Sequence, residues 1–316
     1  MKTPPTIPGA VAIAAILGAI APAAARAGDS LTGVTALTSQ VSADYVRARL
    51  PDGSFQAEYY SFGQGGKWGG EIADTTMDRL NFMDVARGIA PALAGQRYLP
   101  APSADPGATR LLIMVYWGTT QVPGPASDSV SYDELGVAQA NLSKYMTQSV
   151  TDPRKKVAVG GGAADAALSQ MSAALTLLNM ENEQRDRLDF RNAHMLGYDS
   201  EGLIGTDYGR NLRGTVLDNK RVELVSEIEE NRYFVILMAY DFQLLWKQKK
   251  HKLLWETRFS INERHNAFDK ALPVMAQYAS RYFGQDSHGL LRSQVPEGRV
   301  DVGEAKSLGE IEAPAK

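Results

Sequence analysis

The chain has 316 residues, no cysteine and a formal net charge of −3. The absence of cysteine excludes disulfide bonds and thiolate metal sites, and the acidic balance argues against nonspecific binding to nucleic acid. A chain of this length can bury a hydrophobic core without such crosslinks.

Residues 1–27 have the three parts of a secretory signal peptide. Lys2 precedes an apolar run over residues 9–21, and small residues lead to Ala25-Arg26-Ala27. The run is shorter than the roughly 20 residues that a membrane span needs. We expect cleavage, a mature chain that begins near Gly28 with no transmembrane segment, and a periplasmic or secreted location. An uncleaved N-terminal anchor is the alternative.

Cleavage would make the mature protein more acidic. Removing Lys2 and Arg26 lowers the number of basic residues from 33 to 31, against 36 acidic residues, and gives a net charge of −5. The missing cysteine also excludes lipid attachment after the cleavage site.

The segment that follows predicts two strands, a glycine-rich loop and a helix. Residues 34–50 are polar and favour a strand, Asp52-Gly53 is a hairpin-type turn, and residues 54–62 form the returning strand. The stretch GQGGKWGG then predicts a loop. A helix opens at Thr75-Thr76, and Pro91 is expected to kink it or end it early.

A buried strand and a helical insertion come next. Residues 111–117 form a short continuous apolar run, which is typical of a central strand. A helical insertion at about 120–220 follows, with a short helix over 132–146 and a long helix from about residue 163 to about His194. A further helix is predicted near 220–230.

Strands resume in the C-terminal part of the chain. Residues 234–240 form the strongest apolar run, and residues 253–261 alternate with a period of two. An amphipathic helix spans residues 268–283, and Gly284 caps it. Residues 292–316 are rich in proline, glycine and charge, which predicts a disordered tail.

This order of elements predicts the α+β class. We expect a mainly antiparallel sheet with helices packed on one face and a helical insertion between strands. Residues 28–291 are expected to form a single domain.

Four lysines lie between the last two predicted strands, in the stretch QLLWKQKKHKLLWE. Lys247, Lys249, Lys250 and Lys252 are expected at the tip of a hairpin in water, where charge also discourages edge aggregation. The alternative is a docking site for an anionic surface, such as a phosphorylated glycan or lipid headgroups.

Four aromatic residues lie beside the predicted glycine-rich loop. Tyr59, Tyr60, Phe62 and Trp68 are candidates for an aromatic platform that binds a sugar or a peptide. The alternative is a mobile connection whose aromatic residues alternate between core and surface.

No catalytic residue, cofactor site or metal ligand is predicted. In GGGAAD, Asp165 occupies the place where a dinucleotide-binding turn needs its third Gly or Ala. The chain has no Gly-x-Ser-x-Gly elbow and no His-Glu-x-x-His motif. Asp199, Glu201 and Asp207 offer oxygen ligands among glycines, but their spacing does not fit the EF-hand calcium loop.

The segments ATRLLIMVYWGTT, YFVILMAYDF, HKLLWETRFSI and ALPVMAQYASRYFG share a layout with known proteins. They resemble the uncharacterised exported α+β proteins of bacterial envelopes, in which a Lys-Leu-x-Trp hairpin precedes the final helix. The resemblance covers the sheet and the last helix. It implies an accessory or scaffold role in the envelope and assigns no catalytic residue.

We therefore expect an exported, non-enzymatic accessory or binding protein whose partner is an envelope protein or polymer. One alternative is a hydrolase that acts on an envelope polymer with acidic residues of the 197–214 segment, which two carboxyls converging in a cleft would favour. Another is a self-assembling structural protein, which an uncovered apolar stripe on the helix over 163–180 would favour. The sequence predicts no oligomeric state.

Overall fold

The computed structural model describes residues 34–69, 74–102, 106–122, 124, 129–150, 162–198 and 216–294. The predicted signal peptide, the acidic candidates of the 199–214 segment and residues 295–316 lie outside these ranges.

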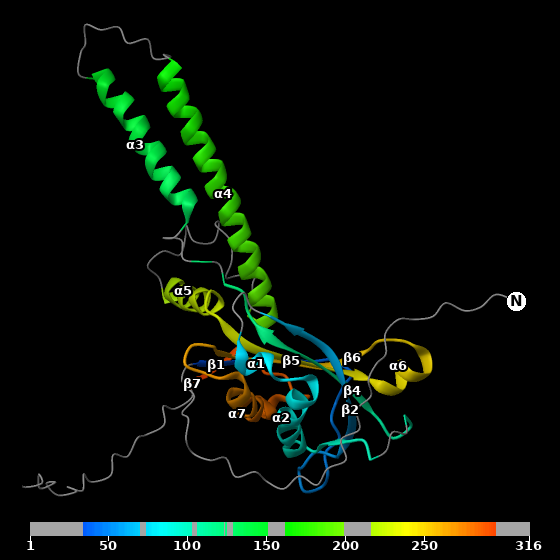
Figure 1. The fold of residues 1–316 in the computed structure, drawn as a ribbon. Coiled ribbons are helices and arrows are strands. Elements are labelled where there is room, and N and C mark those ends of the chain that lie inside the picture. Colours follow the sequence, from blue (N-terminus) through cyan, green and yellow to red (C-terminus); the bar gives the residue numbers. More distant parts are fainter. Residues whose placement is uncertain are drawn as a thin grey trace, which may run out of the picture.

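The described residues form an α+β fold around a mixed, mostly antiparallel sheet, which confirms the predicted class (Figure 1). The sheet has seven strands in the order β3-β2-β4-β5-β6-β1-β7. Only β2 pairs in parallel, with β3 and β4. The strands are β1 (Val34–Val41), β2 (Glu58–Trp68), β3 (Tyr98–Pro100), β4 (Leu111–Thr119), β5 (Arg232–Asp241), β6 (Leu253–Asn262) and β7 (Leu291–Gln294).

Helices α1 (Thr75–Asp78), α2 (Phe82–Gly95) and α7 (Phe268–Ala279) lie together beside the sheet (Figure 1). Asn81 starts α2 with a capping box, in which its side chain accepts from the amides of Met83 and Asp84. Pro91 lies inside α2 and does not end it, because the residues around it, Ile89 and Leu93 among them, are buried in the core.

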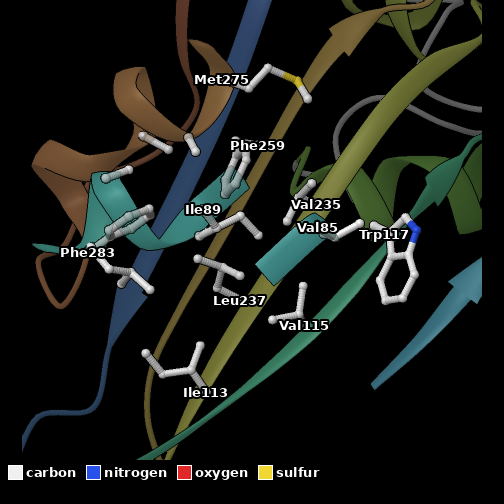
Figure 2. Packing of buried hydrophobic residues seen from close by; sticks show 14 of the residues in the cluster. Val85, Ile89, Ile113, Val115, Trp117, Val235, Leu237, Phe259, Met275 and Phe283 are labelled. Carbon is white, nitrogen blue, oxygen red and sulfur yellow. The ribbon is translucent and has the colours of Figure 1, made fainter. Parts of the chain in front are cut away.

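The main hydrophobic core lies between these helices and the sheet. Figure 2 shows α2 and α7 side chains facing those of the three central strands. Side chains at alternate positions of β4 and β5 point into this layer, which follows from the period of two in a strand. The labelled residues are all buried: Val85, Ile89, Ile113, Val115, Trp117, Val235, Leu237, Phe259, Met275 and Phe283.

Helices also cover the opposite face of the sheet, so the prediction of helices on one face is wrong. The C-terminal part of α4 (Gly162–Leu196) and α5 (Val216–Ile228) pack over Ala36 of β1 and Phe234 of β5. Strands buried on both faces read as continuous apolar runs. The run in β5 is therefore explained by two helical layers.

Helix α4 ends in a Schellman motif that attaches it to the sheet. The amide of Gly197 donates to the carbonyl of His194, and that of Tyr198 to Ala193. Gly197 has a φ of +78° and lies so close to β1 that a Cβ atom would stand 1.8 Å from Oγ1 of Thr38. Glycine is therefore required here by both the backbone and the contact.

The rest of α4 extends away from the sheet beside α3 (Val130–Val150), as Figure 1 shows. The two helices are antiparallel, because Ser129 contacts Glu181 while Asn141 donates to Gln170. Their contact contains the buried side chains of Ala138, Ala167 and Ala174. We call α3 and this part of α4 the arm. The long helix predicted up to about His194 is confirmed.

The N-terminal strands differ from the prediction. β1 pairs with β6 and β7, not with the segment after Asp52-Gly53. That turn does form, with Gly53 at a φ of +82°, but it closes only one isolated bridge between Arg49 and Phe55. The predicted tail also starts too early, because β7 continues to Gln294.

Candidate functional site

Part of the sheet face that carries α4 and α5 bears half-buried apolar side chains. One row of paired residues crosses five strands there: Gln40, Glu256, Met238, Met114 and Gly63. Paired residues point to the same side of a sheet, so this row runs from polar side chains on β1 and β6 to apolar ones on β5 and β4.

Glycines of β2 make room for the large side chains of this face. A Cβ atom on Gly63 would stand 2.4 Å from Sδ of Met114, and one on Gly65 would stand 2.6 Å from the ring of Tyr116. Both contacts are shorter than carbon atoms tolerate. The segment GQGGKW was predicted to be a loop, and it is instead a strand whose glycines receive the side chains of β4.

A cavity of about 480 Å³ lies where this face meets α6 (Phe242–Gln248). This volume is in the range of small-molecule sites, which span about 300–1,000 Å³. The lining is mostly apolar. Its polar groups belong to Lys249, His251 and two tyrosines. The lining residues are Leu112, Met114, Tyr116, Tyr240, Phe242, Leu245, Trp246, Lys249 and His251.

Hydrogen bonds fix α6 over the cavity. Asp241 caps its first turn by accepting from the amide of Leu244 at 2.9 Å. The side-chain amide of Gln243 donates to the carbonyls of Pro106 and Thr109, both at 2.7 Å, in the segment before β4. The first turn of α6 is thus held to the segment that leads into β4.

Lys249 ends α6 in the left-handed region, with a φ of +57°. Its amide donates to the carbonyl of Leu245 at 3.0 Å, which is the usual αL cap. Glycine or asparagine normally fills such a position, because a side chain costs about 1–2 kcal/mol in this conformation. The conformation places Lys249 at the cavity.

The four candidate lysines do not lie on a simple hairpin tip. β5 and β6 pair as predicted, but residues 242–248 between them form α6. Lys247 lies in the last turn of α6, Lys249 lines the cavity, and Lys250 is exposed. Lys252 forms an ion pair with Asp44. The prediction of charge in water is correct for the first three, and the predicted tip is wrong because Asp241 starts a helix.

The four candidate aromatic residues do not form one platform. Tyr60 and Phe62 are only 2% exposed and pack edge to face in the core, with ring centroids 4.7 Å apart. Tyr59 and Trp68 are 39% and 44% exposed, at opposite ends of β2. Side chains along a strand alternate between its two faces, so Tyr59 and Tyr60 point to opposite sides of the sheet. This alternation is present in the sequence, but it becomes informative only once the segment is recognised as β2.

Sequence reading missed the aromatic and apolar residues that do line the cavity. Met114 and Tyr116 were assigned to a fully buried strand, yet both are half-buried. Burial raises the pKa of Tyr240, and Tyr116 and Glu256 add to the effect, so its phenol stays neutral at physiological pH. Its ring meets that of His251 edge to face at 6.3 Å.

A second, polar cavity of about 630 Å³ lies beside the end of α4. Glu256 and Arg258 of β6 line it and form an ion pair with each other. Since Glu256 is also paired in register with Met238, the polar cavity lies next to the half-buried apolar part of the same face. Its other polar lining residues include Thr38, Gln40, His194, Asp286 and Ser287.

The hydrolase alternative needs two carboxyls whose pKa values differ, and Asp74 and Glu263 are one such pair. Burial, followed by the charge of Asp74, raises the pKa of Glu263. Burial also acts to raise the pKa of Asp74, but hydrogen bonds from Tyr233 and Thr76 together outweigh it and lower that pKa. Asp74, however, already caps α1 and accepts from the Tyr233 hydroxyl at 2.5 Å. These contacts give Asp74 a structural role.

No family model, characterised protein or solved structure matches the chain. Within the described ranges, no helix has both the length and the apolar character needed to cross a bilayer. In the same ranges, no group of three or more His, Asp or Glu side chains is placed to hold a metal ion. The geometry of the cavity and of the arm is therefore the basis for assigning a function.

Proposed function

We propose that the protein is an exported, non-enzymatic accessory protein that binds an apolar ligand in the cavity between α6 and the sheet. The observation that carries this proposal is the cavity of about 480 Å³, with apolar walls on a strand and on a helix held by hydrogen bonds. Concave, mostly apolar sites with a few placed polar groups are typical of ligand binding.

The lining chemistry favours binding over catalysis. The titratable side chains at the cavity are two tyrosines, Lys249 and His251, and no carboxylate is among its lining residues. A general acid and base pair for polymer hydrolysis would need two carboxyls there. Export rests on the signal peptide predicted over residues 1–27, and an envelope role rests on the resemblance to exported α+β envelope proteins.

A neutral fluorescent probe, N-phenyl-1-naphthylamine, tests the proposal when titrated into the purified protein. We expect saturable binding that falls roughly tenfold or more in Met114→Glu, because a charge would then face the apolar cavity. The matched control is Val274→Glu, an exposed apolar residue on α7 across the sheet, which should bind normally. Equal binding by both variants, or none by the native protein, would contradict the proposal.

Export is tested separately by N-terminal sequencing of the protein recovered from the envelope fraction. A mature chain that begins near Gly28 is expected. Recovery of the intact N-terminus from the cytoplasm would contradict it.

Self-assembly through the arm is the second candidate, and a specific observation favours it. Leu168, Leu175, Leu177 and Met180 are all more than 40% exposed on α4, so the arm carries an apolar surface that the described residues leave uncovered. Leu168 and Leu175 are seven residues apart and lie on one side of the helix. Exposed apolar patches of this kind often mark protein interfaces.

Sedimentation velocity tests self-assembly. The native protein should sediment as an oligomer, and Leu168→Glu combined with Leu175→Glu should sediment as a monomer of unchanged helical content. A native protein that remains monomeric at all accessible concentrations would exclude this candidate without affecting the cavity.

A further inference from the structure

We infer that the ligand of the cavity is a single-chain amphiphile with an anionic carboxylate, such as a long-chain fatty acid. This inference rests on the proposed function and specifies the class of ligand. It follows from the position of an unpaired cationic rim beside an apolar cavity.

The apolar wall suits an alkyl chain. Leu112, Met114 and Tyr116 are alternate residues of β4, so they form one continuous row along the cavity floor. Leu245 and Trp246 of α6 face this row from the other wall. The volume of about 480 Å³ is that of a site for one small molecule, which favours one chain over a lipid with two.

The cationic rim lies at the C-terminal end of α6. It consists of Lys249, which lines the cavity next to His251, and of Lys247 and Lys250, which are exposed nearby. Within the part of the chain that the structure describes, Lys247, Lys249 and Lys250 form no ion pair.

The nearby carboxylates are already used elsewhere. Asp44 pairs with Lys252, and Glu256 pairs with Arg258. Asp241 caps α6. The rim is therefore locally positive in a protein of negative net charge, and a bound anion would neutralise it.

The backbone at Lys249 is a second, independent feature of the rim. Its φ of +57° is a conformation that glycine adopts without cost. A lysine in this conformation lowers the stability of the protein, and residues with strained backbone conformations cluster at ligand-binding positions. What the lysine adds over glycine is a cation at the mouth of the apolar cavity.

Three ligands with the same alkyl chain and different headgroups test the inference. Dodecanoate, dodecanol and dodecyltrimethylammonium are titrated as monomers into the purified protein, with binding followed by calorimetry and by the fluorescence of Trp246. We expect dodecanoate to bind best and the cationic ligand worst. Trp246→Phe identifies the fluorescence change that belongs to the cavity.

Matched lysine variants locate the headgroup. Lys249→Gln is expected to weaken dodecanoate binding roughly tenfold and to leave dodecanol binding unchanged, because only the charged hydrogen bond is lost. Lys250→Gln, one residue further on, should weaken it much less. Lys249→Gly removes the same charge without the left-handed strain, so a similar loss in this variant excludes misfolding as the cause.

The outcomes separate this inference from the proposed function. Equal binding of all three headgroups would overturn the inference while the cavity still binds apolar ligands. Binding to phosphatidylglycerol vesicles without binding to monomeric dodecanoate would overturn it too, since the rim would then contact a membrane surface. If the neutral naphthylamine probe also fails to bind, the proposed function falls as well.

Discussion

The ring of Tyr116 lies over the backbone of Gly65 so closely that a Cβ atom there would stand 2.6 Å from three ring carbons. Tyr116 is half-buried and lines the cavity, so its position depends on this glycine. In Gly65→Ala the ring must move, because the contact is far shorter than the van der Waals distance. The ring is the free end of its side chain, and it is expected to turn toward the cavity.

We therefore expect Gly65→Ala to weaken binding of the naphthylamine probe several-fold while lowering the free energy of unfolding by only about 1 kcal/mol. Urea unfolding measures the second quantity. Gly66→Ala is the control, since its Cβ would come no closer than 3.6 Å to any neighbour. If Gly66→Ala changes binding as much as Gly65→Ala, Tyr116 does not shape the cavity.

The fold could be predicted where the pattern of apolar residues within one segment indicates a strand or a helix. β4, β5 and β6 are apolar or alternating runs, and the first half of α4 repeats apolar residues at three- and four-residue steps. The first part of β2 falls within the strand predicted over residues 54–62. The glycine-rich part, residues 63–68, was predicted to be a loop, because glycine has no side chain to reveal burial. The reason for glycine in this strand is visible only in the structure, where Met114 and Tyr116 of β4 fill the space next to Gly63 and Gly65.

The pairing of strands that are distant in the sequence could not be predicted either. β1 pairs with β6, so that Leu37 lies opposite Phe259. The local turn at Asp52-Gly53 suggested a hairpin instead, because short-range turn signals say nothing about long-range pairing.

The candidate site was predicted only in part, because it combines residues from three elements. Lys249 was singled out from its charge alone. The cavity that it lines requires α6, and α6 depends on the cap of Asp241 and on the left-handed backbone of Lys249 itself. The repeated LLW of this segment resembles two strand arms, and only the second belongs to a strand.

The contact between α4 and β1 predicts a large effect at Gly197. Gly197→Ala combines a φ of +78° with a Cβ only 1.8 Å from Oγ1 of Thr38, and we expect a loss of about 2–4 kcal/mol in urea unfolding. Gly289→Ala separates the two causes, since its φ is +116° but no atom lies within 4 Å of the added Cβ. Equal losses in the two variants would show that the contact with Thr38 is unimportant.

Asp189 on α4 predicts a dependence of stability on pH. It is 5% exposed, and its Oδ1 has no hydrogen-bond partner among the described residues. Burial, followed by the charges of Glu229 and Asp186, raises its pKa from 3.8 to about 7. Because folding favours the protonated form, stability is highest below the unfolded pKa and falls as the pH rises from about 4 to about 7.

We expect Asp189→Asn to remove this loss, since the amide stays neutral. The measurement is the urea midpoint at about pH 5 and about pH 8. The native protein should lose more stability between these values than the variant does. Parallel curves for the two proteins would show that Asp189 is already ionised at the lower pH.

Replacing Lys249 by glycine is expected to raise the stability of the protein and to weaken ligand binding. Glycine adopts a φ of +57° without the cost that a side chain pays there, so Lys249→Gly should raise the free energy of unfolding by up to about 1 kcal/mol. The same change should weaken dodecanoate binding, because it removes the cation at the cavity. Lys247→Gly is the control: it lies inside the last turn of α6 and should lower stability by about 1 kcal/mol. If Lys249→Gly destabilises the protein, the lysine stabilises the end of α6 and its backbone is not strained for the sake of a ligand.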